Sequence, residues 1–270
     1  MESFKDNSLP RNASSWRKYS GGFLGARPDA IRFDADHFRQ AYMKFMTTPG
    51  SHNDCYASTC HRMFFANRIY HKKDPKDCPD NDGHNVDTID GLILPTIVAL
   101  SDVNASPQVA MQNAQDCARV TRNSRPLQQA SAAWAQLVTS TVRGGESITS
   151  LCQSMARALG MPSPRPKEAG MTACYMSSAV PAMLDHMVHF DSKSPKSVSG
   201  VWSSLLSNAN AGGENVHRGS CMGAVLGASV DETEDWSQSR LVQGLYDKES
   251  IGTEIDSFVD AVLAKKNDEL

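Results

Sequence analysis

The sequence has no long hydrophobic run. No window of its 270 residues approaches the roughly 18–20 uninterrupted apolar residues that a membrane-spanning helix needs. It also has no excess of basic residues, because 27 Lys and Arg stand against 30 Asp and Glu and give a formal net charge of −3. A protein that binds nucleic acid needs a concentrated basic surface to meet the phosphates. We therefore expect neither a membrane nor a nucleic acid as a partner.

Paired cysteines are missing as well. The seven cysteines are odd in number and contain no Cys-x-x-Cys pair, which is typical of reduced thiols in a cytosolic protein. The first residues lack the apolar core of a signal peptide, so we expect a cytoplasmic location. The last four residues, Asn267 to Leu270, resemble an ER-retention tetrapeptide, but that address has meaning only for a chain that enters the ER.

The alternation of polar and apolar residues that marks a half-buried strand is also absent. Apolar residues recur instead at helical spacing in one segment after another, which predicts an all-α fold built as a single compact multi-helix bundle. Residues 1–27 are polar and are expected to form a flexible N-terminal segment, and residues 28–266 to form the helical domain. Among the expected helices are residues 169–190, with a break at Pro181, and residues 236–245.

One stretch concentrates polar side chains and glycines. From Asn208 to Gly219 it reads Asn-Ala-Asn-Ala-Gly-Gly-Glu-Asn-Val-His-Arg-Gly, and Gly219, Gly223 and Gly227 then follow four residues apart. On a helix these three glycines share one bare face, against which another helix can pack closely. The pattern predicts a loop that presents polar groups at the N-terminus of a buried helix, where unpaired N–H groups favour anions. A plain loop before a core helix is the alternative.

A second polar stretch comes before an apolar segment. It contains Asp82, His84, Asn85, Asp87 and Asp90 within nine residues. Such a group of side chains either lines a cleft or caps a helix and faces solvent, and the sequence leaves both interpretations open.

Arg62 and a pair of histidines have two possible interpretations each. Arg62 comes just before three apolar residues, so it could meet a phosphate against an apolar wall or lie on the surface over core aromatics. His186 and His189 have a helical spacing that permits a shared metal ion, but the sequence offers no third ligand.

The order Asn-Ala-Gly-Gly-acid-Asn before a Gly/Ala helix resembles the C-terminal metal-site motif of the ADP-ribosylglycohydrolase superfamily, usually written Gly-Gly-Asp-Thr-Asp-Thr. It is most similar to the branch that includes lens crystallin J1 and selenoprotein J. Further segments match in the same order between about Phe33 and Leu245. These are residues 52–56, 61–65 and 82–95, with Thr121 and Trp236.

The resemblance implies an all-helical hydrolase. In this superfamily the bond that is cleaved is the glycosidic bond between ADP-ribose, or a related ribosyl group, and a protein side chain or small acceptor. Two divalent metals, usually magnesium, lie in a cleft between an N-terminal acidic motif and the Gly-Gly loop. The expected cofactor is therefore Mg, and the expected partner is ADP-ribose or an ADP-ribosylated small molecule or protein.

The family's residues can be carried over one position at a time. Glu214 takes the first acidic ligand position, Val216 the second, and His217 the position of the closing threonine. Valine cannot ligate, and imidazole favours softer metals than magnesium. The resemblance assigns catalytic roles to Glu214 and Asp87, metal ligation to Glu214 and His217, and ligand binding to His84, Asn85, Gly212, Gly213, Asn215, Arg218 and Arg62.

Two features of the family are not recognisable, the Gly/Ala-rich first helix and the N-terminal acidic motif. We therefore expect a chain that lacks this portion of the family or has diverged in it. Together with Val216, this departure keeps a second hypothesis open, a non-catalytic crystallin-like binding or structural protein with a degenerate metal site.

Overall fold

The computed structural model describes residues 33–52, 55–81, 83, 86–193, 196–230 and 233–268, with the side chains of the last helix described up to Ala264. In these residues it contains eleven α-helices, two short 3-10 helices and no β-strand. The predicted all-α class is confirmed. The expected flexible segment, residues 1–27, lies outside the described residues.

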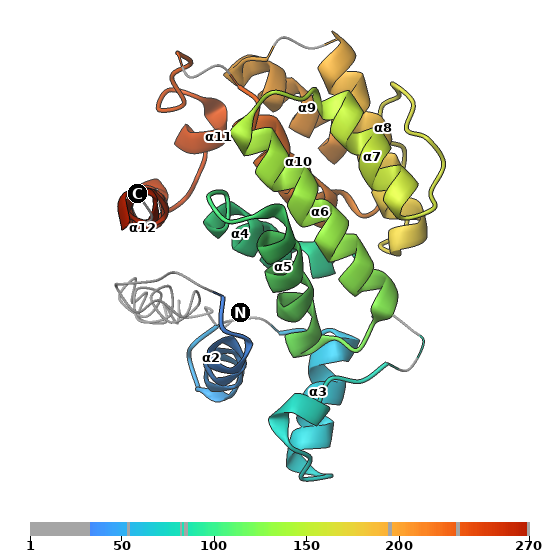
Figure 1. Cartoon of the computed structure of the whole chain (residues 1–270), viewed down its shortest axis with the longest axis vertical. Helices are drawn as coiled ribbons and strands as arrows, with labels where there is room; N and C mark the ends of the chain where they lie inside the picture. The colour runs from blue at the N-terminus through green and yellow to red at the C-terminus, as the bar shows by residue number, and fades with distance from the viewer. Residues whose placement is uncertain are drawn as a thin grey trace, which may run out of the picture.

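Helices α2 (Ala35–Thr47) and α3 (Thr59–Ile69) form one end of the molecule, followed by the 3-10 turn η1 (Pro75–Asp77) (Figure 1). Asp34 caps α2, because its carboxylate accepts from the backbone N–H groups of Asp36 and His37 at 2.9 and 3.0 Å. Tyr42 and Phe64 meet edge to face with ring centroids 5.1 Å apart. They belong to a small apolar cluster that joins these helices to the centre of the molecule.

The centre consists of the 3-10 turn η2 (Ile89–Leu92) and the helices α4 (Ile93–Ser101), α5 (Pro107–Thr121) and α6 (Arg125–Arg143). Serines 106 and 124 cap α5 and α6, each with a proline in the first turn of the helix, where the missing N–H has no partner to lose. Trp134 is fully buried in α6, and its indole N–H donates to Thr96 Oγ1 of α4 at 2.7 Å. This bond satisfies the one polar atom of the largest core side chain.

The other end contains α7 (Ile148–Ala158), α8 (Met176–Lys193), α9 (Val198–Asn210) and α10 (Asn215–Ala228). Helix α10 packs against α9 along the predicted glycine face. A Cβ atom placed at Gly219 would stand 2.9 Å from Asn208 Nδ2, and one placed at Gly223 would stand 3.9 Å from Leu205. The bare face expected from the glycine spacing is confirmed on the α9 side.

Three details of the sequence interpretation need correction. The helix expected over 169–190 begins only at Met176, because the residues before it run extended between two other segments. Pro181 lies inside α8 and does not end it. The helix expected over 236–245 is reduced to α11 (Arg240–Gln243), after which α12 (Lys248–Asp268) closes the described chain.

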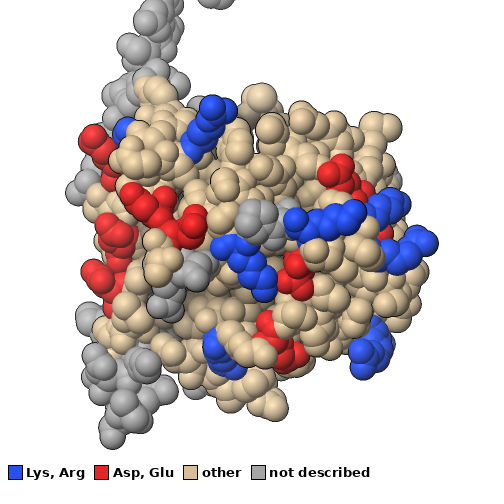
Figure 2. All heavy atoms as spheres, turned by 90° about the horizontal axis from the view of Figure 1, so that it is seen from above, with Lys and Arg blue, Asp and Glu red and all other residues tan. Residues whose placement is uncertain are grey.

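The surface carries both signs of charge. Figure 2 shows acidic and basic side chains spread over the same face without a continuous basic area. None of the described helices is both long enough and apolar enough to cross a membrane.

Candidate functional site

A cavity of about 220 Å³ lies where α3, η2, the end of α5 and the start of α10 meet. Its polar lining consists of His61, Asp90, Thr121, Arg122 and His217. The rest is mostly apolar and comes from α4, α5 and α6. Polar side chains on four separate elements thus converge on one hollow whose remaining walls are mostly apolar.

Asp90 and Arg122 form an ion pair in this cavity, in which the guanidinium is buried and the carboxylate is partly buried. The carboxylate Oδ2 accepts from Arg122 Nη2, and Oδ1 accepts from Arg122 Nη1 at 3.3 Å and from the Thr88 hydroxyl. Arg122 is the C-cap of α5, where the chain becomes extended and its side chain can turn back toward η2. Burial raises the pKa of Asp90, but the charge and hydrogen bonds of Arg122 outweigh it, so the net pKa of this carboxyl is lowered.

His61 enters the cavity from the inner side of α3. Its Nδ1 lies 2.8 Å from the Tyr42 hydroxyl, which fixes the orientation of the ring. Burial lowers the pKa of His61, and the nearby Arg122 charge lowers it further. The neutral imidazole is therefore the favoured form at neutral pH.

The Gly-Gly loop lies beside the cavity and is shorter than expected. Helix α9 continues to Asn210, so only residues 211–214 are left as a loop. Gly212 and Gly213 both have left-handed backbone angles, with φ of +72° and +63°. At Gly213 the backbone of Thr172 comes so close that a Cβ atom would stand 2.3 Å from the Thr172 carbonyl oxygen. Only glycine fits there.

An extended segment, residues 171–175, connects the two polar stretches of the sequence. On one side Thr172 pairs with Gly213, and the Glu214 N–H donates to the Thr172 carbonyl at 2.9 Å. On the other side Tyr175 pairs with Thr88, and the Ile89 N–H donates to the Cys174 carbonyl at 2.9 Å. The bridges hold the loop before η2 and the Gly-Gly loop at a fixed separation.

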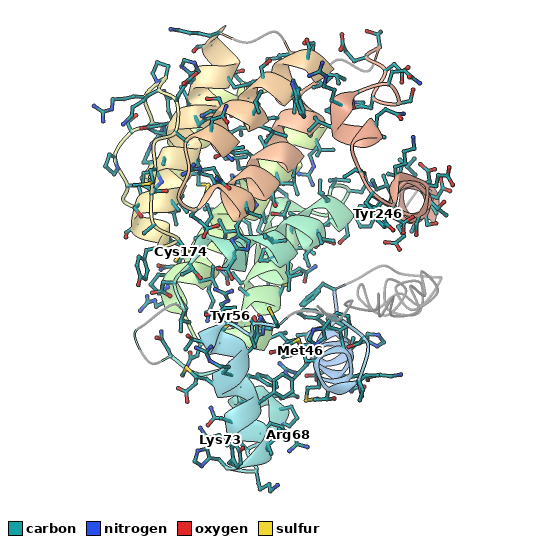
Figure 3. The ribbon with its side chains drawn as sticks, turned by 180° about the vertical axis from the view of Figure 1, so that it is seen from behind. Met46, Tyr56, Arg68, Lys73, Cys174 and Tyr246 are labelled. Atoms are coloured by element: carbon teal, nitrogen blue, oxygen red, sulfur yellow. The ribbon has the colours of Figure 1, made fainter. Side chains whose placement is uncertain are left out.

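Cys174 lies in this segment, at the foot of α8 (Figure 3). Burial raises the pKa of its thiol, and the neighbouring Glu214 carboxylate raises it further. The thiol is thus held protonated, which makes it a poor nucleophile.

Glu214 and His217 form a pair at the start of α10. Glu214 is the N-cap of the helix and accepts from the His217 N–H at 3.4 Å, while its Oε1 lies 2.5 Å from His217 Nδ1. The His217 imidazole lines the cavity, and the His217 side chain is 40% exposed. Val216, between them in sequence, points to solvent with 69% of its surface exposed. Position 216, where this chain has valine in place of the family's acidic ligand, therefore faces away from the cavity.

Arg218 and Asn215, which the resemblance assigns to ligand binding, make their hydrogen bonds within the protein, although Arg218 Nη2 is buried without a partner. Arg218 is completely buried, with Nε donating to Asn208 Oδ1 at 2.6 Å and Nη1 to Thr172 Oγ1 at 2.8 Å. The Asn215 side chain donates to the Ala209 carbonyl at 3.0 Å, at the C-terminus of α9. Both residues therefore hold the Gly-Gly loop in shape.

Arg62 and Asp87, two further assigned residues, do not line this cavity. Arg62 is on the exposed side of α3, where it donates to the Ala57 carbonyl at 2.9 Å and lies over the Tyr56 ring. Asp87 accepts from the Ser124 hydroxyl and lines a second cavity of about 350 Å³ next to Tyr175. His84 and Asn85 lie outside the described residues.

Sequence reasoning missed His61 and Arg122 as cavity residues. His61 lies in the matched segment 61–65, but the site role there was assigned to its neighbour Arg62, and Arg122 directly follows the matched Thr121. Adjacent residues on a helix point about 100° apart, so a match to a short motif does not say which of the two faces inward.

A magnesium pair does not fit the described residues. Magnesium needs several oxygen ligands at short range, but both oxygens of Asp90 are engaged by Arg122 and Thr88, and Glu214 Oε1 is engaged by His217. No group of three or more His, Cys, Asp or Glu side chains within the described ranges could hold a metal ion. The pair His186 and His189 offers no alternative, because His186 is buried and uses both ring nitrogens, on the Ala169 N–H and on Ser204.

The fold and the cavity define an all-α protein with a polar hollow beside a Gly-Gly loop. The chain belongs to the ADP-ribosylglycohydrolase family, whose sequence model matches residues 19–269. This match is longer than the stretch between Phe33 and Leu245 on which the resemblance was based. No individual curated protein matches the sequence. Membership supports a glycohydrolase-type function and implies ADP-ribosylated substrates at a coarse level.

Proposed function

We propose that this protein hydrolyses the glycosidic bond between a ribosyl group, such as that of ADP-ribose, and its acceptor, and that the cavity lined by Asp90, Arg122 and His217 is where the bond is cleaved. The observation that carries the proposal is the convergence of these polar side chains on one cavity next to the Gly-Gly loop, in a chain of this family. The cavity of about 220 Å³ is smaller than the pockets of roughly 300–1,000 Å³ that enclose whole drug-sized ligands. It suits one sugar unit, with the remainder of the ligand outside.

The chemistry of the proposed reaction fits the charges in the cavity. Cleavage of a glycosidic bond passes through an oxocarbenium-like state with positive charge on the sugar, which a carboxylate stabilises. Because the pKa of Asp90 is lowered, its carboxylate is ionised at neutral pH. Glu214 holds the His217 ring through Nδ1, which leaves Nε2 to take a proton from water or to give one to the leaving group.

Binding without turnover is the second candidate. It is favoured because both carboxylates are already paired with a basic side chain. Asp90 is paired with Arg122, and Glu214 is paired with His217. A carboxylate that stays paired orients a ligand but is less able to meet charge that develops on it.

The test is release of ADP-ribose from peptides that carry it on arginine or on serine, measured by chromatography. We expect release by the natural chain and a loss of roughly 100-fold or more in Glu214→Gln, which keeps the shape of the side chain but removes its charge. The matched control is Glu249→Gln in the exposed first turn of α12, outside the cavity lining, which should leave the rate unchanged.

The outcomes separate the two candidates. Binding of ADP-ribose by calorimetry without any release would favour the binding protein. Neither binding nor release would refute both, and equal loss in the two variants would refute the assignment to this cavity.

A further inference from the structure

We propose that the cavity takes its ligand without a divalent metal ion, with the Arg122 guanidinium supplying the fixed positive charge at this place. The nature of the ligand, a ribosyl compound, rests on the proposed function. The statement about the metal does not, because it concerns what the protein's own side chains leave open to an ion.

The first argument is the engagement of Asp90. Its two oxygens face Arg122 Nη1 and Nη2, and the Thr88 hydroxyl adds a third donor to Oδ1. A magnesium ion bound to this carboxylate would have to share it with the guanidinium. Two positive charges held that close in a partly buried site repel each other more strongly than they would in open water.

The second argument is that the Arg122 guanidinium is held in its place beside Asp90. Its side chain is only 6% exposed, and Nη1 also donates to the Val86 carbonyl at 3.1 Å and to Thr88 Oγ1 at 2.8 Å. The backbone N–H of Arg122 is fixed as well, because it donates to the Ala118 carbonyl and ends α5. Moving the guanidinium aside would leave the partly buried Asp90 charge without its counter-ion and two buried acceptors without this donor, which is unfavourable.

The third argument concerns the opposite wall. Glu214 is the carboxylate next to the cavity on the α10 side, and its Oε1 is only 2.5 Å from His217 Nδ1. Imidazole is a weak choice for magnesium, which prefers oxygen ligands. Among the described residues, the two carboxylates at this cavity are therefore each paired with a basic group of the protein.

The fourth argument is that the Arg122 guanidinium supplies the positive charge that a metal ion would otherwise supply in this cavity. Arg122 keeps the Asp90 carboxylate ionised, as the lowered pKa of that group indicates, and it fixes its orientation through two parallel contacts. His61 and His217 add ring nitrogens to the same lining. A hydroxyl or phosphate oxygen of a ligand would find donors there without an added ion. Arg122 is thus a positioning residue for Asp90.

The first experiment uses the metal alone. Mn²⁺, which is paramagnetic and prefers the same oxygen ligands as magnesium, is titrated into the full chain, and the free ion is followed by electron paramagnetic resonance. We expect no binding that depends on the cavity. Binding that Asp90→Asn and Glu214→Gln both abolish would overturn the proposal, whereas binding that neither variant changes would support it, because the ion would then lie elsewhere.

The second experiment measures ADP-ribose binding by calorimetry in EDTA and in excess magnesium. We expect dissociation constants that agree within about twofold, and a tightening of about tenfold or more by magnesium would overturn the proposal. Absence of binding in both conditions would contradict the proposed function, while the manganese titration would still decide the question of the metal.

Arg122→Lys is the matched variant, because it keeps the charge and removes the two-pronged contact with Asp90. We expect it to weaken ADP-ribose binding by roughly tenfold in EDTA, with a folded circular dichroism spectrum as the control. Unchanged affinity in a folded Arg122→Lys protein would overturn the role given to the guanidinium. Should this variant not fold, the manganese titration of the natural chain still tests the proposal.

Discussion

Replacement of Gly213 by alanine should be far more damaging than the same change at Gly212. Both glycines have left-handed backbone angles. An alanine at Gly212 would meet no atom within 4 Å, whereas at Gly213 its Cβ would stand 2.3 Å from the Thr172 carbonyl oxygen and 2.8 Å from the Thr172 nitrogen. The two neighbours therefore share the conformational cost and differ in the contacts that a Cβ at residue 213 would make with residues 171 and 172.

The magnitudes follow from these two contributions. Holding alanine in the left-handed region costs about 1–2 kcal/mol, which is the whole effect expected for Gly212→Ala. In Gly213→Ala the extended segment must also move away, at roughly 1–3 kcal/mol for forced repacking and about 1 kcal/mol for the hydrogen bond from the Glu214 N–H to Thr172. We expect a total destabilisation of about 3–6 kcal/mol for Gly213→Ala.

Urea unfolding followed by far-UV circular dichroism measures both variants against the natural chain. We expect the midpoint to fall slightly for Gly212→Ala and strongly for Gly213→Ala, with similar slopes. Because the segment at Thr172 also joins the loop before η2, ADP-ribose binding should weaken only in the Gly213 variant. Equal midpoints in the two variants would refute the close approach of Thr172, and an unchanged midpoint in both would refute the left-handed loop.

Two further predictions concern buried basic groups. Arg218→Ala should lower the free energy of unfolding by about 3 kcal/mol, because it leaves a cavity and the buried Asn208 oxygen without its donor, whereas Arg119→Ala on the surface should cost under about 1 kcal/mol; similar urea midpoints for the two would contradict this. Burial lowers the pKa of His186 from 6.5, so its neutral form stabilises the fold above about pH 6.5, and this stability should be lost as the pH falls from there toward the lowered value. Urea midpoints between about pH 5 and pH 8 should show this loss, and His186→Gln should reduce it; an equal loss in the variant would assign the slope to other groups.

Much of the helical framework could be predicted from local sequence alone. Ser106-Pro107 is a cap and a first turn that need no tertiary partner, and α5 begins there as the sequence indicates. The spacing of the glycines in α10 predicts a close contact with another helix, and α9 makes this contact. Local patterns fail where a distant segment decides, as in residues 171–175, which run extended because Thr88 and Gly213 pair with them on either side.

The site is likewise divided between features that local sequence predicts and features that distant segments decide. The sequence by itself determined the family, the all-α class and the Gly-Gly-Glu loop at the head of α10, because these depend on the order and spacing of residues near each other. Only the tertiary structure decided that His61 rather than Arg62 faces the cavity and that Arg218 of α10 is buried beneath the Gly-Gly loop, against Asn208 and Thr172. It also decided that Arg122 meets Asp90, which is 32 residues away in the chain. Contacts of this kind depend on the crossing and rotation of packed helices, which no local pattern fixes.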